Sequence, residues 1–174
     1  MRILGGTLRG RTIHLPRKTE VRPTTGRARE GFFSHIQNEL PGASFLDVFA
    51  GSGLMGIEAL SRGARSVTFI ERDGNVLQAL QGNLAALHLT AEIVSGDAMK
   101  ILPQLHDRGK CFTIAYADPP YGFTRYDELY DLLVSLVPEG EIAIEAVKPH
   151  PLSVAGDRIL TYGQTIIACF YRPT

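Results

Sequence analysis

Four consecutive residues, Asp118-Pro119-Pro120-Tyr121, combine the groups needed to hold an amino group beside an aromatic ring. Proline fixes φ and donates no hydrogen bond, which leaves the Pro119 carbonyl oxygen available to a ligand. That oxygen and the Asp118 carboxylate can accept both hydrogens of one exocyclic NH₂ group. Tyr121 can stack on the attached ring, as aromatic side chains do with unstacked nucleobases. The tetrapeptide therefore predicts a site for an amino-bearing base, although each residue alone would also fit a plain turn.

A glycine-rich loop predicts a second site. The apolar segment 44–50 has the length of a buried strand and runs into Gly51-Ser52-Gly53-Leu54-Met55-Gly56, and residues 57–60 look helical. Glycine accepts positive φ and lets a ligand lie against bare backbone. Asp47 lies inside the strand, where a carboxylate needs hydrogen-bond donors or a cationic ligand. A strand, a glycine loop and a helix form the nucleotide-binding opening of an open α/β sheet.

The glycine pattern alone does not identify the nucleotide. The absence of a following Lys-Ser or Lys-Thr pair excludes a P-loop. The letters at 51–56 also fit G-x-G-x-x-G, so a nicotinamide-dependent oxidoreductase is the alternative to a simple nucleoside site. The tetrapeptide at 118–121 favours the nucleoside site, because it supplies contacts for a base.

Carboxylates recur after successive predicted strands. Glu71 ends the second strand, twenty residues after Gly51, a spacing suited to binding ribose hydroxyls. Asp97 follows the third strand and can accept a hydrogen bond from an adenine amino group. A single strand-end carboxylate is usually solvated, but three in succession are more informative. Because ligands bind beyond the carboxyl ends of parallel strands, we expect Asp47, Glu71, Asp97 and Asp118 to lie at one edge of a sheet.

Strands and helices alternate from residue 44 onward, which is typical of an α/β protein. The last two predicted strands, 158–162 and 165–171, must pair antiparallel, because the two-residue turn leaves no room for a crossover helix. The sequence predicts a seven-stranded, mainly parallel sheet with an antiparallel terminal hairpin and helices on both faces. The other expected strands are 67–71, 92–94, 112–118 and 142–145; helices are expected from 24 or 25 to 40, over 76–88, through 101–102 and over 126–136.

Positive charge is concentrated near the N-terminus. Residues 1–36 contain eight Arg or Lys and two Glu, a net charge of +6, whereas residues 37–174 contain ten basic and sixteen acidic residues, a net charge of −6. Such asymmetry indicates contact with a polyanion, with a solvated basic arm as the alternative. The pieces 2–6 and 10–15 predict a small hairpin. We therefore expect a basic extension over residues 1–40, made of a hairpin and a helix, and a ligand-binding domain over residues 41–174.

The composition is that of an ordinary globular protein, with 44% hydrophobic and 21% charged residues in a chain of 174. The chain shows no signal-peptide core and no apolar stretch of membrane-spanning length, so we expect a cytoplasmic protein. Cys111 and Cys169 lie in apolar runs and are expected to be buried, reduced thiols. The five histidines show no ligand spacing, so no metal is expected.

The motif residues resemble those of the class I S-adenosylmethionine-dependent methyltransferases that act on exocyclic amines. This resemblance rests on residues 47–53, Glu71, Asp97 and Asp118-Pro119-Pro120-Tyr121. Almost the whole chain is similar to the bacterial 16S rRNA guanine-N2 methyltransferases that modify guanine 966. That closer likeness rests on Arg2-Ile3-Leu4-Gly5-Gly6, Arg22-Pro23-Thr24, Arg29-Glu30, residues 56–63 and Tyr162-Gly163. Adenine-N6 enzymes share the Asp-Pro-Pro-Tyr motif, so the N-terminal segment carries the choice of base.

The resemblance implies a Rossmann-like fold, S-adenosylmethionine as cofactor, and a monomeric, metal-free enzyme acting on 16S rRNA or the assembling small ribosomal subunit. It implies catalytic roles for Asp118, Pro119, Pro120 and Tyr121. It implies cofactor contacts for Asp47, Ala50, Gly51, Ser52, Gly53, Glu71, Arg72, Asp97 and Ala98. It implies RNA contacts for Arg9, Arg11, Arg22, Thr24, Arg27 and Arg29. The alternatives are a methyltransferase for an amine of another RNA or DNA base, and a non-catalytic RNA-binding assembly module.

Overall fold

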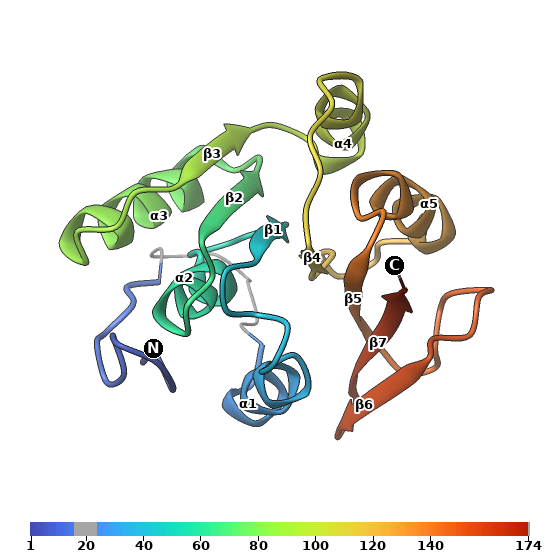
Figure 1. Ribbon diagram of the computed structural model, residues 1–174, viewed down its shortest axis with the longest axis horizontal. Coiled ribbons are helices and arrows are strands. Elements are labelled where there is room, and N and C mark those ends of the chain that lie inside the picture. The colour runs from blue at the N-terminus through green and yellow to red at the C-terminus, as the bar shows by residue number, and fades with distance from the viewer. Residues whose placement is uncertain (16–23, 174) are drawn as a thin grey trace.

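A single seven-stranded sheet runs through the protein, with the strand order β3-β2-β1-β4-β5-β7-β6 (Figure 1). The computed structural model describes residues 1–15 and 24–173. The strands are β1 (Ser44–Val48), β2 (Ser66–Glu71), β3 (Glu92–Ser95), β4 (Ile114–Ala117), β5 (Gly140–Val147), β6 (Arg158–Tyr162) and β7 (Thr165–Arg172). The helices are α1 (Gly26–His35), α2 (Leu54–Ser61), α3 (Gly74–Ala86), α4 (Ala98–Asp107) and α5 (Tyr126–Leu136).

The pairing confirms the predicted topology. Strands β1 to β5 are parallel to one another, and β7 is antiparallel to both β5 and β6. The sheet therefore has five parallel strands and a terminal hairpin. The chain order reverses at β1 and β4, which is the switch point where open α/β sheets bind ligands.

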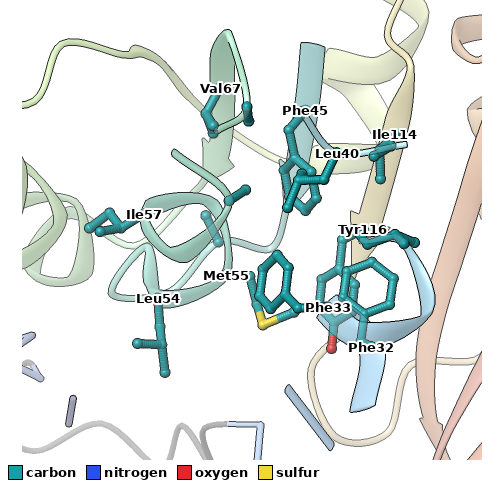
Figure 2. Packing of buried hydrophobic residues seen from close by; sticks show 14 of the residues in the cluster. Phe32, Phe33, Leu40, Phe45, Leu54, Met55, Ile57, Val67, Ile114 and Tyr116 are labelled. Carbon is teal, nitrogen blue, oxygen red and sulfur yellow. The ribbon is translucent and has the colours of Figure 1, made fainter. Parts of the chain in front are cut away.

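Helices cover both faces of the sheet and create two apolar cores. The face covered by α1, α2 and α3 contains Phe45 of β1 and Tyr116 of β4, packed against Phe32 and Phe33 of α1 (Figure 2). The other face, covered by α4 and α5, contains the intervening residues of the same strands. Because side chains alternate along a strand, strands buried on both faces are nearly continuous in apolar residues.

The N-terminal segment packs onto the first of these cores. Arg2 forms an antiparallel bridge with Thr12, which confirms the predicted hairpin. Ile3 and Ile13 of this hairpin are fully buried in the core. Thr25 caps α1 by accepting a hydrogen bond from Ala28 N at 3.3 Å, as the sequence indicated.

Two local expectations were wrong. Helix α1 ends at His35 rather than Leu40, because the chain turns at Ile36 to reach β1. Cys111 is exposed in the turn between α4 and β4, where Phe112 fills the second core instead, whereas Cys169 is buried on β7 as expected. In the described parts of the chain, every helix is too short or too polar to cross a bilayer.

Candidate active site at the carboxyl ends of β1, β4 and β5

The glycine loop after β1 is held by carboxylates on two strands. Glu71 Oε2 accepts a hydrogen bond from Gly51 N at 2.9 Å, while Oε1 accepts from the backbone of Arg72 and Asp73 at 2.8 and 2.9 Å. Among the described residues, Oε2 therefore has the greater capacity for a further donor, such as a hydroxyl. Glu71 both fixes the loop and faces the space above it.

Asp47 lies beneath this loop. Its Oδ2 accepts a hydrogen bond from Gly56 N at 2.8 Å, and the residue is 2% exposed. The pKa of Asp47 is raised to about 8. Burial is the main cause, the Glu71 charge adds to it, and the hydrogen bond from Gly56 partly offsets it. A cation above the loop would favour the charged carboxylate, since opposite charges lower a carboxyl pKa.

The loop conformation depends on glycine at one position in particular. Gly53 has φ +79°, and an added Cβ there would lie 2.2 Å from Leu80 Cδ1. A side chain at this position would therefore be both strained and overpacked. The neighbouring Ser52 is tied by its carbonyl to Asn83 Nδ2 at 3.0 Å.

The third strand end is more exposed. Asp97 Oδ1 caps α4 by accepting from Met99 N at 3.0 Å, and Asp97 Oδ2 lies 4.0 Å from Arg72 Nη1. Both of these charged side chains are largely exposed, so this pair adds little stability. Ala98 is buried at the start of the helix. One carboxylate oxygen of Asp97 thus caps α4, and the other lies at the surface.

The tetrapeptide 118–121 lies beside the glycine loop. Asp118 N donates to Val48 O at 3.3 Å, and Phe123 N donates to Pro120 O at 3.0 Å to close the turn. The Phe49 and Phe123 rings meet edge to face at 5.7 Å between centroids. The segments that flank the two loops assigned from the sequence to cofactor and base are therefore in contact.

Tyr121 projects from this turn with 97% of its surface exposed. An aromatic ring that is so exposed has no apolar partner among the described residues. Its position at the rim, beyond Asp118, is compatible with stacking on an incoming base.

Strand register brings a carboxylate from β5 to the same place. Ala117 of β4 is level with Ile144 of β5, so the next residues, Asp118 and Glu145, lie side by side. Burial raises the pKa of Asp118 well above its usual range, and the charges of Glu145 and Asp47 raise it further. Glu145 was not among the predicted site residues; the available signal was an acidic residue inside an apolar strand.

Two hydroxyl groups hold Glu145. Thr24 Oγ1 donates to Glu145 Oε2 at 2.8 Å, and the Tyr116 hydroxyl donates to the same oxygen. Thr24 is 5% exposed, so the expectation that it contacts RNA directly was wrong. Burial against the sheet directs its hydroxyl inward.

Arg29 was also expected to contact RNA, and the structure contradicts this. It is 2% exposed and its Nε lies 2.7 Å from Glu58 Oε2 in α2, while Nη2 donates to Arg2 O at 2.8 Å. Arg62 Nη2 binds the other oxygen of Glu58 at 2.8 Å. Burial lowers the pKa of Arg29, and the Glu58 carboxylate raises it. This cluster fastens the N-terminal segment to α2.

The other arginines of the extension that the structure describes lie at the surface. Arg9, Arg11 and Arg27 are exposed. Arg22 lies outside the described residues. Exposed arginines can bind phosphates, so the surface of the extension keeps the predicted positive charge.

His35, Glu141 and Cys169 form a cluster of possible metal ligands in the described part of the chain, with the ligand atoms within 4.8 Å of one another. His35 Nε2 lies 2.9 Å from Glu141 Oε1. Burial and the Glu141 charge raise the pKa of the Cys169 thiol, which disfavours the thiolate that metals bind. The His35–Glu141 hydrogen bond joins α1 to β5, a contact that histidine spacing did not predict.

Comparisons with known proteins agree with this architecture. The chain is 34% identical over 180 residues to a Bacillus subtilis (strain 168) protein provisionally named rRNA methyltransferase YlbH, covering 98% of each. It is 42% identical over 134 residues to ribosomal RNA small subunit methyltransferase D of Escherichia coli (strain K12), covering 76% of this chain and 66% of that protein. The solved structure of yhhF from Escherichia coli, provisionally titled a methyltransferase, has a TM-score of 0.86 at 34% identity, with 100% and 98% coverage.

The fold is thus that of the Rossmann-like methyltransferases, with the ligand loops at the switch point of the sheet. The model of one protein family, described as conserved hypothetical protein 95, matches residues 1–170, and the chain belongs to that family.

Proposed function

We propose that this protein methylates N2 of guanine 966 in 16S rRNA, with S-adenosylmethionine as the methyl donor. The observation that carries the proposal is the contact between the segments that flank two loops: Phe49, just before the glycine loop after β1, meets Phe123, just after the Asp118–Tyr121 turn that follows β4. The names of the similar proteins support the rRNA substrate. The likeness of the N-terminal segment to guanine-N2 enzymes supports the base.

The proposed cofactor supplies a methyl group on a positively charged sulfur, so the protein's task is alignment and electrostatic support. The Gly51–Gly53 backbone holds its amino-acid part, with Ala50 and Ser52 beside it and Asp47 supplying negative charge from below. Glu71 and Arg72 face the ribose, and Asp97 with Ala98 faces the adenine. Each of these residues lies at the carboxyl end of β1, β2 or β3.

At the base, the chain acts on a weak nucleophile, because the guanine N2 lone pair is delocalised into the ring. Asp118 and the Pro119 carbonyl accept the two N2 hydrogens, Pro120 fixes the turn, and Tyr121 stacks on the ring. As the new C–N bond forms and the C–S bond breaks, positive charge develops on nitrogen beside Asp118. The leaving proton passes to Asp118 or to water.

Residues 1–40 form the proposed RNA-facing extension, and residues 41–174 the catalytic domain. Arg9, Arg11 and Arg27 are the exposed basic residues that support this division. A monomer acting in the cytoplasm, where small subunits assemble, fits a substrate much larger than the enzyme.

The decisive experiment incubates the purified chain with labelled S-adenosylmethionine and either free 16S rRNA or small-subunit particles lacking the modification. Mapping of the labelled nucleoside should give N2-methylguanine at position 966. A label at adenine N6 would replace the proposed base. Binding of NADH without methyl transfer would favour the oxidoreductase, and rRNA binding without transfer would favour an assembly module.

A further inference from the structure

Two neighbouring strands end in acidic residues on the same face of the sheet. Asp118 follows β4 and Glu145 lies on β5, level with it, on the face that α1 covers. Glu145 is 8% exposed. Two carboxylates brought together in a buried place are costly unless neighbouring groups favour their charged forms. The surroundings of Glu145 supply such groups.

The donors to Glu145 come from separate parts of the chain. Tyr116 comes from β4 and lies under Phe32 of α1, with ring centroids 4.9 Å apart (Figure 2). Thr24 comes from the turn before α1 and lies 3.4 Å from the Tyr116 hydroxyl. One carboxylate oxygen of Glu145, on β5, therefore accepts hydrogen bonds from both β4 and the N-terminal segment, beside Asp118.

We propose that Glu145 is a positioning residue for methyl transfer: through Thr24 and Tyr116 it fixes the edge of the base site, and its charge strengthens Asp118 as a hydrogen acceptor. This inference rests on the proposed function. A stronger acceptor stabilises the positive charge that develops on the attacking amino group. Glu145 acts through Asp118 and does not touch the reacting atoms.

Other groups also face Asp118 and would contribute to its titration. Asp47 lies on β1, Tyr116 on β4 and Tyr126 on α5, and the Thr24 side chain, which donates to Glu145, lies nearby. Burial raises the pKa of Asp118 most, the charges of Glu145 and Asp47 raise it further, and the nearby Thr24 lowers it. Because protonated Asp118 is a weaker acceptor, the methyl-transfer rate should fall as pH decreases through its pKa. Removing the Glu145 charge should move that fall to lower pH.

The test is Glu145→Gln, measured by single-turnover methyl transfer across pH with S-adenosylmethionine binding measured in parallel. We expect the maximal rate to fall about tenfold and the acid midpoint to move down by about one pH unit, the size of a single nearby charge. Cofactor affinity should stay within about twofold. A purely structural role would lower the melting temperature without moving the midpoint.

Glu141→Gln is the matched control. Glu141 lies on the same strand and the same face, is 5% exposed, and pairs with His35 rather than with the site. Its substitution should leave the rate and the midpoint unchanged. An unchanged profile in Glu145→Gln, or an equal change in Glu141→Gln, would overturn the inference.

Tyr116→Phe tests the same point if Glu145→Gln does not fold. It keeps the ring against Phe32 and removes only the hydroxyl that donates to Glu145. Glu145 then binds a proton more readily, so the acid midpoint should move in the same direction by a smaller amount. A midpoint that does not move in this folded variant also rejects the inference. Inactivity of the wild-type protein would reject the proposed function instead, so the two failures are distinguishable.

Discussion

The proposed cofactor side and the proposed base side of the site are built in different ways. On the cofactor side, Asp47, Glu71 and Asp97 accept hydrogen bonds from backbone N–H groups of the glycine loop and of the first turns of α2 and α4. On the base side, Glu145 is held by side-chain hydroxyls, one of them from the N-terminal segment. The cofactor loop is therefore determined locally, by three adjacent strand ends. The base site depends on the N-terminal segment being in place.

The largest expected effect comes from Asp118→Asn, which should impair methyl transfer at the base side and leave cofactor binding intact. Loss of a preorganised acceptor for the developing charge should reduce the single-turnover rate on the order of a hundredfold or more. Binding of S-adenosylmethionine, measured by calorimetry, should change little, because the cofactor loop keeps its own carboxylates. Simultaneous loss of cofactor binding would show that Asp118 supports both sides.

Arg29→Ala tests the attachment of the N-terminal segment. It leaves the buried Glu58 with only Arg62 among its described partners, and breaking a buried ion pair in this way should reduce the free energy of unfolding by about 3 kcal/mol. Urea denaturation measures this change. Arg27→Ala, two residues away and exposed, is the control and should change stability by about 0.5 kcal/mol or less. Equal effects would contradict the burial of Arg29.

Asp47→Asn tests the cofactor side through pH. In the free protein the pKa of Asp47 is about 8, and a cationic ligand favours the ionised form, so binding releases a proton. The affinity of the wild-type protein for S-adenosylmethionine should therefore rise as pH increases towards about 8 and then level off. The variant should lose this dependence and bind about tenfold more weakly at pH 9.

The same substitution affects stability in the opposite direction. A carboxyl whose pKa is raised in the folded state stabilises the protein when protonated, and that contribution is lost as pH rises from about 4 to about 8. Asp47→Asn, which can still accept from Gly56 N, should therefore melt at a higher temperature than the wild type at pH 9 in the absence of ligand. Identical melting curves at pH 9 would show that Asp47 is not desolvated.

The smallest effect is expected at the surface of the extension. Replacing Arg9 and Arg11 together by Ala should weaken rRNA binding by about tenfold or less and reduce the salt dependence of log K by about two. Filter binding at several salt concentrations measures both. Arg65→Ala, an exposed arginine outside the extension, is the control. Reduced cofactor binding in the double variant would indicate a folding defect.

Elements with local signals were predictable from the sequence. The bounds of α5 were predicted correctly, and Thr25 was recognised as a candidate cap. The glycine loop was located because an apolar segment of strand length runs directly into Gly51-Ser52-Gly53, and Gly53 does adopt positive φ. The tight turn between β6 and β7 gave their antiparallel pairing.

Partnerships between distant residues were not predictable. An arginine near a helix start gives no sign of Glu58, which approaches it from another helix, so Arg29 looked like a surface residue. Thr24 and Glu145 meet only after the N-terminal segment has packed across β4 and β5. These contacts are set by tertiary packing, which periodicity and spacing do not encode.

The N-terminal segment is anchored at both sides of the site. His14 exchanges two backbone hydrogen bonds with the side chain of Asn83, which also binds the carbonyl of Ser52 in the glycine loop, whereas Thr24 binds Glu145. A ligand that displaces Ser52 can act on the hairpin through Asn83, and one that displaces Thr24 can act on Glu145. We therefore expect heterotropic cooperativity, in which bound S-adenosylmethionine and bound rRNA alter each other's dissociation constants by the same factor.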